Sequence, residues 1–145
     1  MSGRVKIKIE VEQDEDGYPP FGIESMWAEL TAGGSYRLQN IPFYARGICR
    51  GDTVSAFFDG KNLIYRDVLC RSGNSTIRAV LFDLSATDDV VKLLDSIGCD
   101  HEWHKSCNLV AINVIDETAY LKLIAYLKEM SGRGILDFEE ATMRF

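Results

Sequence analysis

The sequence predicts an α+β fold, with a small β-barrel-like half in residues 1–75 and a ferredoxin-like half in residues 76–145. The first half holds short apolar-polar alternations separated by glycine-containing turns, a pattern typical of small barrels. The second half changes to strands that alternate with two helix-like segments, in the order β-α-β-β-α-β. Because 145 residues can bury a sizeable core, we expect the two halves to pack as one compact unit.

Several segments of the first half are predicted to be strands, because β-branched, aromatic and alternating apolar residues dominate them. These segments are residues 4–12, 24–30, 35–38, 53–58 and 62–71. The dipeptides Gly33-Gly34 and Asp59-Gly60 between them are signals for turns, and the second is a strong hairpin signal. The spacing therefore predicts a small barrel or a strongly twisted sheet.

Residues 40–58, NIPFYARGICRGDTVSAFF, are predicted to continue this pattern as an extended segment, in which Pro42 suits an edge strand or a bulge. Alternate positions of a strand share a face, so one apolar set is expected to be buried: Ile41, Phe43, Val54, Ala56 and Phe58. Arg46, Arg50 and Asp52 are expected at the rim. An Asp after Gly is more often a turn-stabilising side chain than a catalytic one.

Two helices are predicted in the second half, at residues 87–97 and 117–130, each with an apolar stripe at helical spacing. Thr87 is the expected N-cap of the first helix and Asp116 opens the second. The four strands expected around them are residues 75–83, 100–106, 109–115 and 135–145. Right-handed connections then place both helices on one face of a four-stranded antiparallel sheet.

The chain is acidic, and its charge is uneven. Of the net −6, residues 1–86 contribute −1 (10 Lys/Arg, 11 Asp/Glu) and residues 87–145 contribute −5 (6 Lys/Arg, 11 Asp/Glu). Phosphate binding needs clustered Lys/Arg, so no nucleic-acid ligand is expected. An acidic surface suits a basic protein partner, although it also serves solubility alone.

A cytoplasmic protein without a membrane partner is expected from the hydropathy pattern. No apolar run approaches the roughly 18 residues of a transmembrane helix. Val5, Ile7 and Ile9 alternate with charged residues near the N-terminus, whereas a signal peptide has an uninterrupted apolar segment.

A cluster of potential zinc ligands, Cys99, His101, His104 and Cys107, has the spacing C-x-H-x-x-H-x-x-C. Residues 100–106 have the pattern of a strand, on which the two histidines point to opposite faces. We therefore expect no metal and no cofactor. The four cysteines lack a C-x-x-C pair, which favours reduced thiols in a cytoplasmic chain.

No Walker loop, nucleophile elbow or metalloprotease motif occurs in the sequence, so no catalytic residue is assigned. Acidic stretches, two tryptophans and the charged residues of the 40–58 segment form the candidate partner-binding set: Asp14, Glu15, Asp16, Trp27, Arg46, Arg50, Asp52, Trp103, Asp137, Glu139 and Glu140. A second set could present hydroxyl and N–H groups to an anion: Ser72, Asn74, Ser75, Thr76 and Arg78. Both sets also have structural interpretations, as half-buried strand residues, solvated faces and turn residues.

Several motifs in residues 24–103 resemble a bacterial family of about this length that is catalogued as a domain of unknown function. The matching segments are ESMWAEL, NIPFYARGICRGDTVSA, SGNSTIRAVLFD and LLDSIGCDHEW. The resemblance implies no established activity, cofactor or partner.

Three functions compete. The preferred one is a non-enzymatic acidic binding protein, most concretely a bacterial immunity protein that neutralises a toxin, such as a basic nuclease, by direct binding. The second is a small-molecule-binding regulatory module. The third is a hydrolase or nuclease that uses Asp52, His101 or His104. Oligomeric state is left open.

Overall fold

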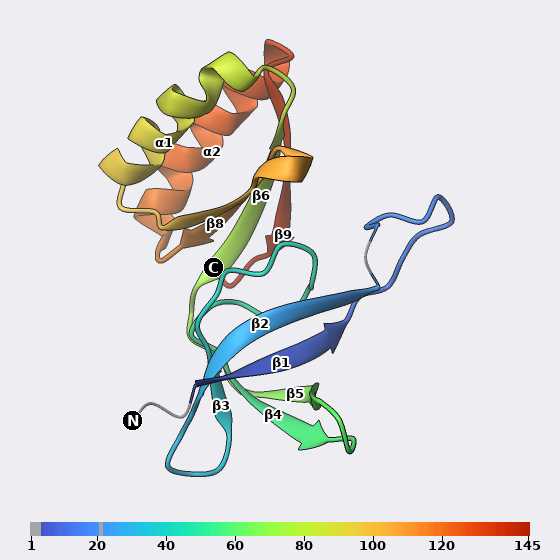
Figure 1. Cartoon of the computed structure of the whole chain (residues 1–145). Helices are drawn as coiled ribbons and strands as arrows, with labels where there is room; N and C mark the ends of the chain where they lie inside the picture. Colours follow the sequence, from blue (N-terminus) through green and yellow to red (C-terminus); the bar gives the residue numbers. More distant parts are fainter. Residues whose placement is uncertain (1–3, 21) are drawn as a thin grey trace. The chain divides into compact units, whose positions relative to one another are not determined.

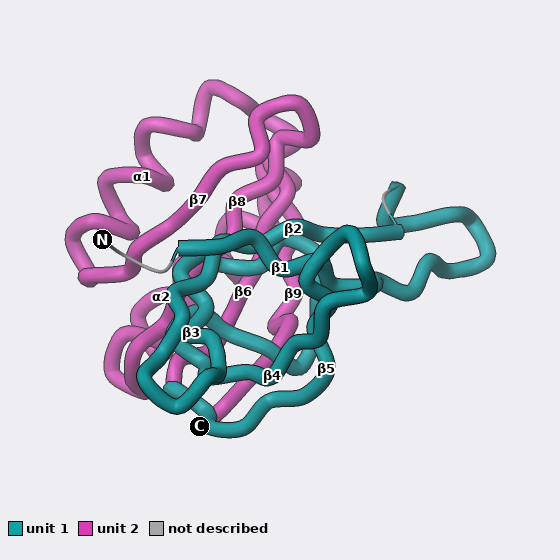
Figure 2. Tube along the Cα trace, turned by 60° about the horizontal axis from the view of Figure 1, so that its bottom comes forward, with its two compact units in different colours: residues 1–72 teal, residues 73–145 magenta. Residues whose placement is uncertain are grey.

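The computed structural model describes residues 4–20 and 22–145, and the chain divides after Ser72 into two units (Figure 2). Unit 1 is residues 1–72, and in its described part the regular structure is all β. Unit 2 is residues 73–145 and contains both α-helices. The α+β class predicted from the sequence is confirmed.

Unit 1 is a closed barrel of five strands (Figure 1). They are β1 (Arg4–Glu10), β2 (Ile23–Leu30), β3 (Tyr36–Leu38), β4 (Thr53–Phe58) and β5 (Leu63–Cys70). Neighbours along the chain pair antiparallel, and a parallel pairing of β1 with β5, Ile7 opposite Leu63, closes the barrel. Of the two predicted arrangements, a small barrel or a strongly twisted sheet, the barrel is confirmed.

The barrel interior is filled by alternate strand residues and by two residues of the loop between β3 and β4. Buried side chains of the strands are Ile7, Ile9, Met26, Ala28, Leu38 and Val54. Ala45 and Ile48 of the loop join the same cluster, at 3% and 1% exposure. The loop is thus part of the core of unit 1 and not a surface appendage.

The predicted extended segment before β4 is wrong, because residues 40–52 contain no strand. Pro42 supplies no N–H, and the N–H groups that follow it bond to a side-chain carboxylate, as described below. The expected burial of the apolar set is met only in part. Ile41 and Val54 are buried, Phe43 and Ala56 are half-buried, and Phe58 at the end of β4 is 66% exposed.

Unit 2 is a four-stranded antiparallel sheet with the order β7-β8-β6-β9 and two helices over one face (Figure 1). Its elements are β6 (Ser75–Leu81), α1 (Thr87–Ser96), β7 (His101–His104), β8 (Leu109–Val114), α2 (Glu117–Gly132) and β9 (Leu136–Thr142). Short 3-10 turns, Leu84–Ala86 and Lys105–Cys107, precede α1 and β8.

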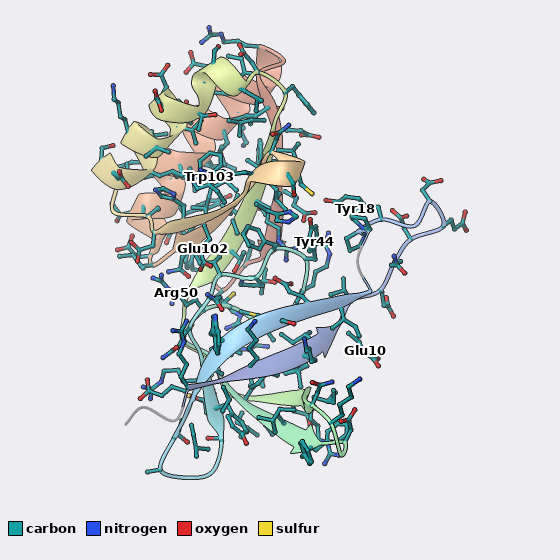
Figure 3. The ribbon with its side chains drawn as sticks, viewed as in Figure 1. Glu10, Tyr18, Tyr44, Arg50, Glu102 and Trp103 are labelled. Carbon is teal, nitrogen blue, oxygen red and sulfur yellow. The ribbon has the colours of Figure 1, made fainter. Side chains whose placement is uncertain are left out.

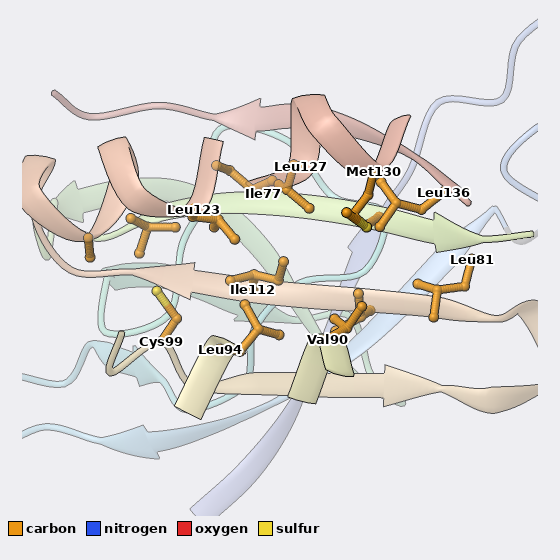
Figure 4. Packing of buried hydrophobic residues seen from close by; sticks show 14 residues of the cluster. Ile77, Leu81, Val90, Leu94, Cys99, Ile112, Leu123, Leu127, Met130 and Leu136 are labelled. Carbon is orange, nitrogen blue, oxygen red and sulfur yellow. The ribbon is translucent and has the colours of Figure 1, made fainter. Parts of the chain in front are cut away.

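The core of unit 2 lies between the helices and the sheet (Figure 4). The sheet contributes alternate residues such as Ile77 of β6 and Ile112 of β8, and the helices contribute Leu94 and Leu123. Each of these four side chains is fully buried. Full burial of a Leu or Ile stabilises the fold by about 1.5–3 kcal/mol, so these helical stripes hold α1 and α2 to the sheet.

The helix starts follow the sequence signals with one difference. Asp116 caps α2 by accepting a hydrogen bond from the Ala119 N–H at 2.8 Å, as expected. Thr87 is the first residue of α1 and not its N-cap, because the preceding 3-10 turn runs directly into the helix and Thr87 Oγ1 donates to the Leu84 carbonyl. In the described ranges, 4–20 and 22–145, no helix has both the length and the apolar character needed to cross a membrane.

Candidate functional site

The loop of residues 40–52 is held to the barrel by a buried carboxylate, Glu24 at the start of β2. Its oxygens accept hydrogen bonds from three consecutive backbone N–H groups, Phe43 at 2.6 Å, Tyr44 at 3.0 Å and Ala45 at 2.8 Å. Glu24 is only 9% exposed. Hydrogen bonds to a carboxylate are stronger than those between neutral groups, so these three bonds fix the start of the loop to β2.

Asp52 holds the other end of the same loop. Its side chain is fully buried, with Oδ2 accepting from the Cys49 N–H and Oδ1 from the Ser72 N–H, both at 2.9 Å. The expected position of Asp52 at the rim is therefore wrong, although the expected turn-stabilising contact is present. The physical reason is that the backbone N–H groups of Cys49 and Ser72 need an acceptor where the chain turns into β4.

The two arginines of the loop lie at different depths. Arg46 is exposed, as expected, and Arg50 is half-buried. Each is followed by a glycine with a positive φ, Gly47 at 81° and Gly51 at 86°, which a side chain would strain. Arg50 also contributes its carbonyl oxygen as acceptor for Ser72 Oγ at 2.8 Å.

The β1–β2 loop, residues 11–22, carries the N-terminal acidic stretch; residue 21 lies outside the described part of the chain. Asp14 orders this loop, because its Oδ1 accepts from the N–H groups of both Asp16 and Tyr18 at 2.9 Å. The backbone N–H of Asp14 donates to the Tyr18 carbonyl at 2.7 Å. The side chains of Glu12, Glu15 and Asp16 are exposed around this turn.

An aromatic pair connects the two loops of unit 1. Tyr18 packs edge-on against Tyr44, with ring centroids 6.3 Å apart (Figure 3). Tyr18 is still 55% exposed. The β1–β2 loop therefore presents acidic side chains beside an accessible aromatic ring.

Trp27 of the candidate set lies on the outer face of β2, half-buried beneath two cations. The Arg4 guanidinium carbon is 4.1 Å and Lys6 Nζ is 4.9 Å from the indole ring. Both cations come from β1, where Lys6 is directly opposite Trp27. This arrangement covers the ring by cation–π contacts and favours a structural role over an interface anchor.

The candidate anion-binding residues do not form an open turn. The Ser72 N–H is committed to Asp52, and Ser75 and Thr76 are fully buried at the start of β6. Ser75 Oγ accepts from the Arg144 N–H at 2.8 Å. Asn74, between them, is half-buried. Anion binding by this set stays a prediction, and the arrangement follows from the fold, because β6 is an inner strand of the sheet and begins directly after the Ser-Gly-Asn turn.

Arg78, the predicted cation of that set, is 3% exposed within β6. Its Nε lies 3.8 Å from Glu139 Oε1 on the neighbouring strand β9. Of the other acidic residues on β9, Asp137 and Glu140 are exposed. Glu140 Oε1 accepts a 2.6 Å hydrogen bond from the Tyr120 hydroxyl, which raises the pKa of Tyr120 above its ordinary value.

Trp103 on β7 is fixed by a chain of hydrogen bonds. Its Nε1 donates to His101 Nδ1 at 2.9 Å, and His101 Nε2 lies 3.1 Å from Asp95 Oδ1 on α1. The Nε2–H tautomer of His101 satisfies both contacts. His101 and Trp103 share a face of the strand because they are two residues apart.

The four zinc-type ligands do not converge. Cys99 is buried in the core of unit 2, whereas His101 contacts Asp95 and His104 Nε2 lies 3.4 Å from Ser106 Oγ. In the described part of the chain, no group of three or more His, Cys, Asp or Glu side chains is placed to hold a metal ion. Burial raises the pKa of the Cys99 thiol to about 11, and the nearby Asp116 and Asp100 carboxylates add to this shift.

We predict a large difference in thiol reactivity from these surroundings. Thiolate is the reactive form, so the raised pKa and burial keep Cys99 unmodified by a disulfide reagent in the folded protein at mildly alkaline pH. The exposed Cys70 is expected to react first. Peptide mapping by mass spectrometry measures both, with unfolded protein as the control. Equal modification of Cys70 and Cys99 in the folded state would contradict the prediction.

Glu24 and the pair of Asp95 with His101 are the positions that sequence reasoning missed. A signal for Glu24 exists, because it shares the inward face of β2 with the apolar residues Met26 and Ala28. A carboxylate on an apolar face needs hydrogen-bond donors. No comparable local signal joins Asp95 to His101, since that contact depends on how α1 meets β7.

These observations define an α+β protein in which a closed five-stranded barrel precedes a sheet that carries two helices. Residues 24–138 match the family described as a domain of unknown function, DUF4265, and the chain belongs to this family. The resemblance found in the motifs is therefore confirmed.

One solved structure extends the comparison to the whole fold. It is a crystal structure of a hypothetical protein from Neisseria gonorrhoeae, with a TM-score of 0.84 and 21% sequence identity, and the match covers 98% of this chain and 96% of that chain. At this identity the likeness concerns the fold alone. No curated protein matches the chain.

Proposed function

We propose that this chain is a non-enzymatic binding protein that docks a basic protein partner, most concretely a bacterial immunity protein that neutralises a toxin by direct contact. The observation that carries the proposal is the ordered acidic β1–β2 loop. Asp14 is used internally to fix the turn, and this leaves Glu12, Glu15 and Asp16 exposed in a defined arrangement. A preorganised loop loses less conformational entropy when a partner binds.

The charge balance of the two units supports a basic partner. Unit 1 is close to neutral, with 9 Lys/Arg and 10 Asp/Glu, so the exposed acids of its β1–β2 loop are a local concentration of negative charge. Unit 2 has 7 Lys/Arg and 12 Asp/Glu, a net −5. Electrostatic complementarity of this kind raises the association rate with a positively charged protein.

The first test is a charge reversal of the β1–β2 loop, measured with any toxin domain that sequencing of the adjacent genes identifies; the absence of such a gene would count against the immunity role. We expect slower association at low salt, by about tenfold or more, in the triple variant Glu12→Lys, Glu15→Lys, Asp16→Lys. Added salt should bring the association rates of the variant and the unmodified protein closer together, because it screens the charges. A matched triple reversal elsewhere on the surface serves as the control: Asp67→Lys, Glu117→Lys and Glu129→Lys.

Two results would contradict the proposal. If both triple variants slow association equally, the net charge of the protein determines the association rate, and the β1–β2 loop has no specific role. If the unmodified chain neither binds the toxin domain nor protects cells that co-express it, the immunity role is wrong. An Asp14→Ala variant adds a check on loop order, because it keeps all three exposed acids but removes the acceptor of two backbone N–H groups.

We further propose that unit 2 has a ferredoxin-like fold. The strand order β7-β8-β6-β9 supports this assignment, because the first and third strands of the unit lie in the middle, the second and fourth form the edges, and all pairings are antiparallel. The proposed compartment is the cytoplasm, which the four free cysteines favour, since thiols stay reduced there.

A further inference from the structure

Unit 2 contains a hollow of about 410 Å³ where the end of β6 meets α1 and β7. Its lining is mainly apolar and comes from both 3-10 turns as well as from these elements: Leu81, Leu84, Thr87, Val91, Trp103, Lys105 and Asn108. The volume falls within the roughly 300–1,000 Å³ of small-molecule sites, which combine apolar walls with a few polar groups. We call this hollow the Trp103 cavity.

The Trp103 wall of the cavity is held in place before any ligand arrives. The indole N–H is bound by His101, and His101 in turn contacts Asp95 on α1. Trp103 also packs against the core of unit 2. An aromatic ring with a fixed orientation offers a stacking surface at little entropic cost, which is what a specific ligand site needs.

The polar groups of the cavity have the chemistry to bind an anion. Lys105 is the only charged residue in the lining, and within residues 4–20 and 22–145 its ammonium group forms no ion pair or hydrogen bond. Asn108 also lines the cavity, and its side-chain amide offers N–H donors. Asp88 and Asp89, which follow Thr87 on α1, are exposed and do not line the cavity.

We propose that the Trp103 cavity binds a small organic carboxylate with an apolar body. The apolar part lies against Trp103, Leu84 and Val91, and the carboxylate pairs with the Lys105 ammonium and the Asn108 amide. This site lies wholly within unit 2 and is independent of the acidic β1–β2 loop, so it adds a ligand to the proposed protein-binding function.

The chain offers a built-in control for a binding experiment, because it has two tryptophans, Trp27 in unit 1 and Trp103 in unit 2. In proton–nitrogen NMR spectra of the full chain, each indole N–H gives its own signal. Titration with phenylacetate is expected to shift the Trp103 indole signal and the Lys105 and Asn108 backbone signals at millimolar concentration. The Trp27 indole signal is expected to stay in place.

The charge and the site are tested separately. The neutral analogue 2-phenylacetamide and the cation phenethylamine should bind at least about fivefold more weakly than phenylacetate, as expected for loss of one partly exposed ion pair. Lys105→Met should abolish the preference for phenylacetate over the amide. Lys122→Met, an exposed position on α2 outside the cavity, should leave it unchanged.

Several outcomes would overturn the proposal. They are the absence of a Trp103 shift with phenylacetate, equal or tighter binding of phenethylamine, and an unchanged preference in Lys105→Met. A Val91→Phe variant, which fills the cavity, gives a second measurement and should block the shift while the thermal midpoint stays near that of the unmodified protein. Because Lys105 is exposed, its variant remains informative even if Val91→Phe fails to fold.

Discussion

Replacing Glu24 by alanine is expected to lower the free energy of unfolding of unit 1 by about 3–4 kcal/mol. The substitution removes the acceptor of three backbone N–H groups, those of Phe43, Tyr44 and Ala45. Each buried donor that loses its partner costs roughly 1–3 kcal/mol, and the two partly buried ones recover some of this by bonding to water. The Ala45 N–H is buried and cannot recover it in this way.

Glu24→Gln separates the hydrogen bonds from the bulk of the side chain. Tyr44 and Ala45 share Oε1, which an amide oxygen can replace, whereas Phe43 bonds to Oε2, where the amide would place a second donor. The glutamine variant should therefore lose about 1–2 kcal/mol, less than alanine. Glu10→Ala on β1 is the matched control, because that carboxylate is exposed and should change stability by no more than about 0.5 kcal/mol.

The measurement is urea unfolding followed at each tryptophan separately, by fluorine NMR of protein labelled with 5-fluorotryptophan. Trp27 reports on unit 1 and Trp103 on unit 2. The loop is held by other contacts if the Trp27 signal gives Glu24→Ala a free energy of unfolding within about 1 kcal/mol of the unmodified protein. That difference corresponds to about one ordinary hydrogen bond.

The elements of unit 2 could be predicted from the sequence because their signals are local. The helical stripe of α1 and the alternation in β6 and β8 depend on residues a few positions apart. Most of these elements lie within one or two residues of the expected bounds, as with α1 at Thr87–Ser96 against the predicted 87–97. A cap such as Asp116 is also a local signal, and it is confirmed.

The loop of residues 40–52 could not be predicted in the same way, because its partners are distant in sequence. Its N–H groups bond to Glu24, which lies 19 to 21 residues away from them, and Ser72 bonds to Asp52 at a separation of 20. A periodic pattern carries no information about such pairs. The alternation of Ile41 and Phe43 therefore suggested a strand where side-chain carboxylates replace strand pairing.

The candidate site shows the same division between local and distant information. Local composition correctly marked the exposed acids Asp14 to Asp16 and the exposed Arg46. It could not show that Arg78 is buried on an inner strand, because strand order depends on pairing between β6, β8 and β9. Nor could it show that Trp103 faces a cavity, since α1 and two 3-10 turns form the other walls.

The second large effect is expected at Asp52, where alanine should lower the free energy of unfolding of unit 1 by about 3 kcal/mol. The two carboxylate oxygens each accept one backbone N–H, from Cys49 and from Ser72. The Cys49 N–H is buried, so loss of its Asp52 acceptor carries the larger cost, whereas the partly buried Ser72 N–H can bond to water instead. The turn at Arg50-Gly51 keeps its backbone bonds, from the Asp52 N–H to the Cys49 carbonyl at 3.1 Å and from the Gly51 N–H to the Leu38 carbonyl at 2.8 Å, but loses the side-chain acceptor that links it to Ser72.

Asp52→Asn distinguishes the two bonds. An amide can orient its oxygen toward the buried Cys49 N–H, and the Ser72 N–H then bonds to water. Asp52→Asn should therefore lose only about half as much free energy of unfolding as Asp52→Ala. Asp67→Ala is the control, because its exposed carboxylate accepts no backbone N–H within residues 4–20 and 22–145, so the substitution should change stability by no more than about 0.5 kcal/mol. The Trp27 signal again measures the unfolding of unit 1.

The Asp52 experiment also decides whether the carboxylate has a role besides holding the loop. If Asp52→Ala unfolds unit 1 at markedly lower urea while Asp52→Asn binds the protein partner with unchanged affinity, the carboxylate acts only as the acceptor that joins Cys49 to Ser72. If Asp52→Asn is fully folded under the conditions of the binding experiment but loses partner binding, the carboxylate charge itself is required for recognition. Full stability of Asp52→Ala would contradict the structural role, because the substitution removes a fully buried carboxylate that accepts the buried Cys49 N–H and the Ser72 N–H.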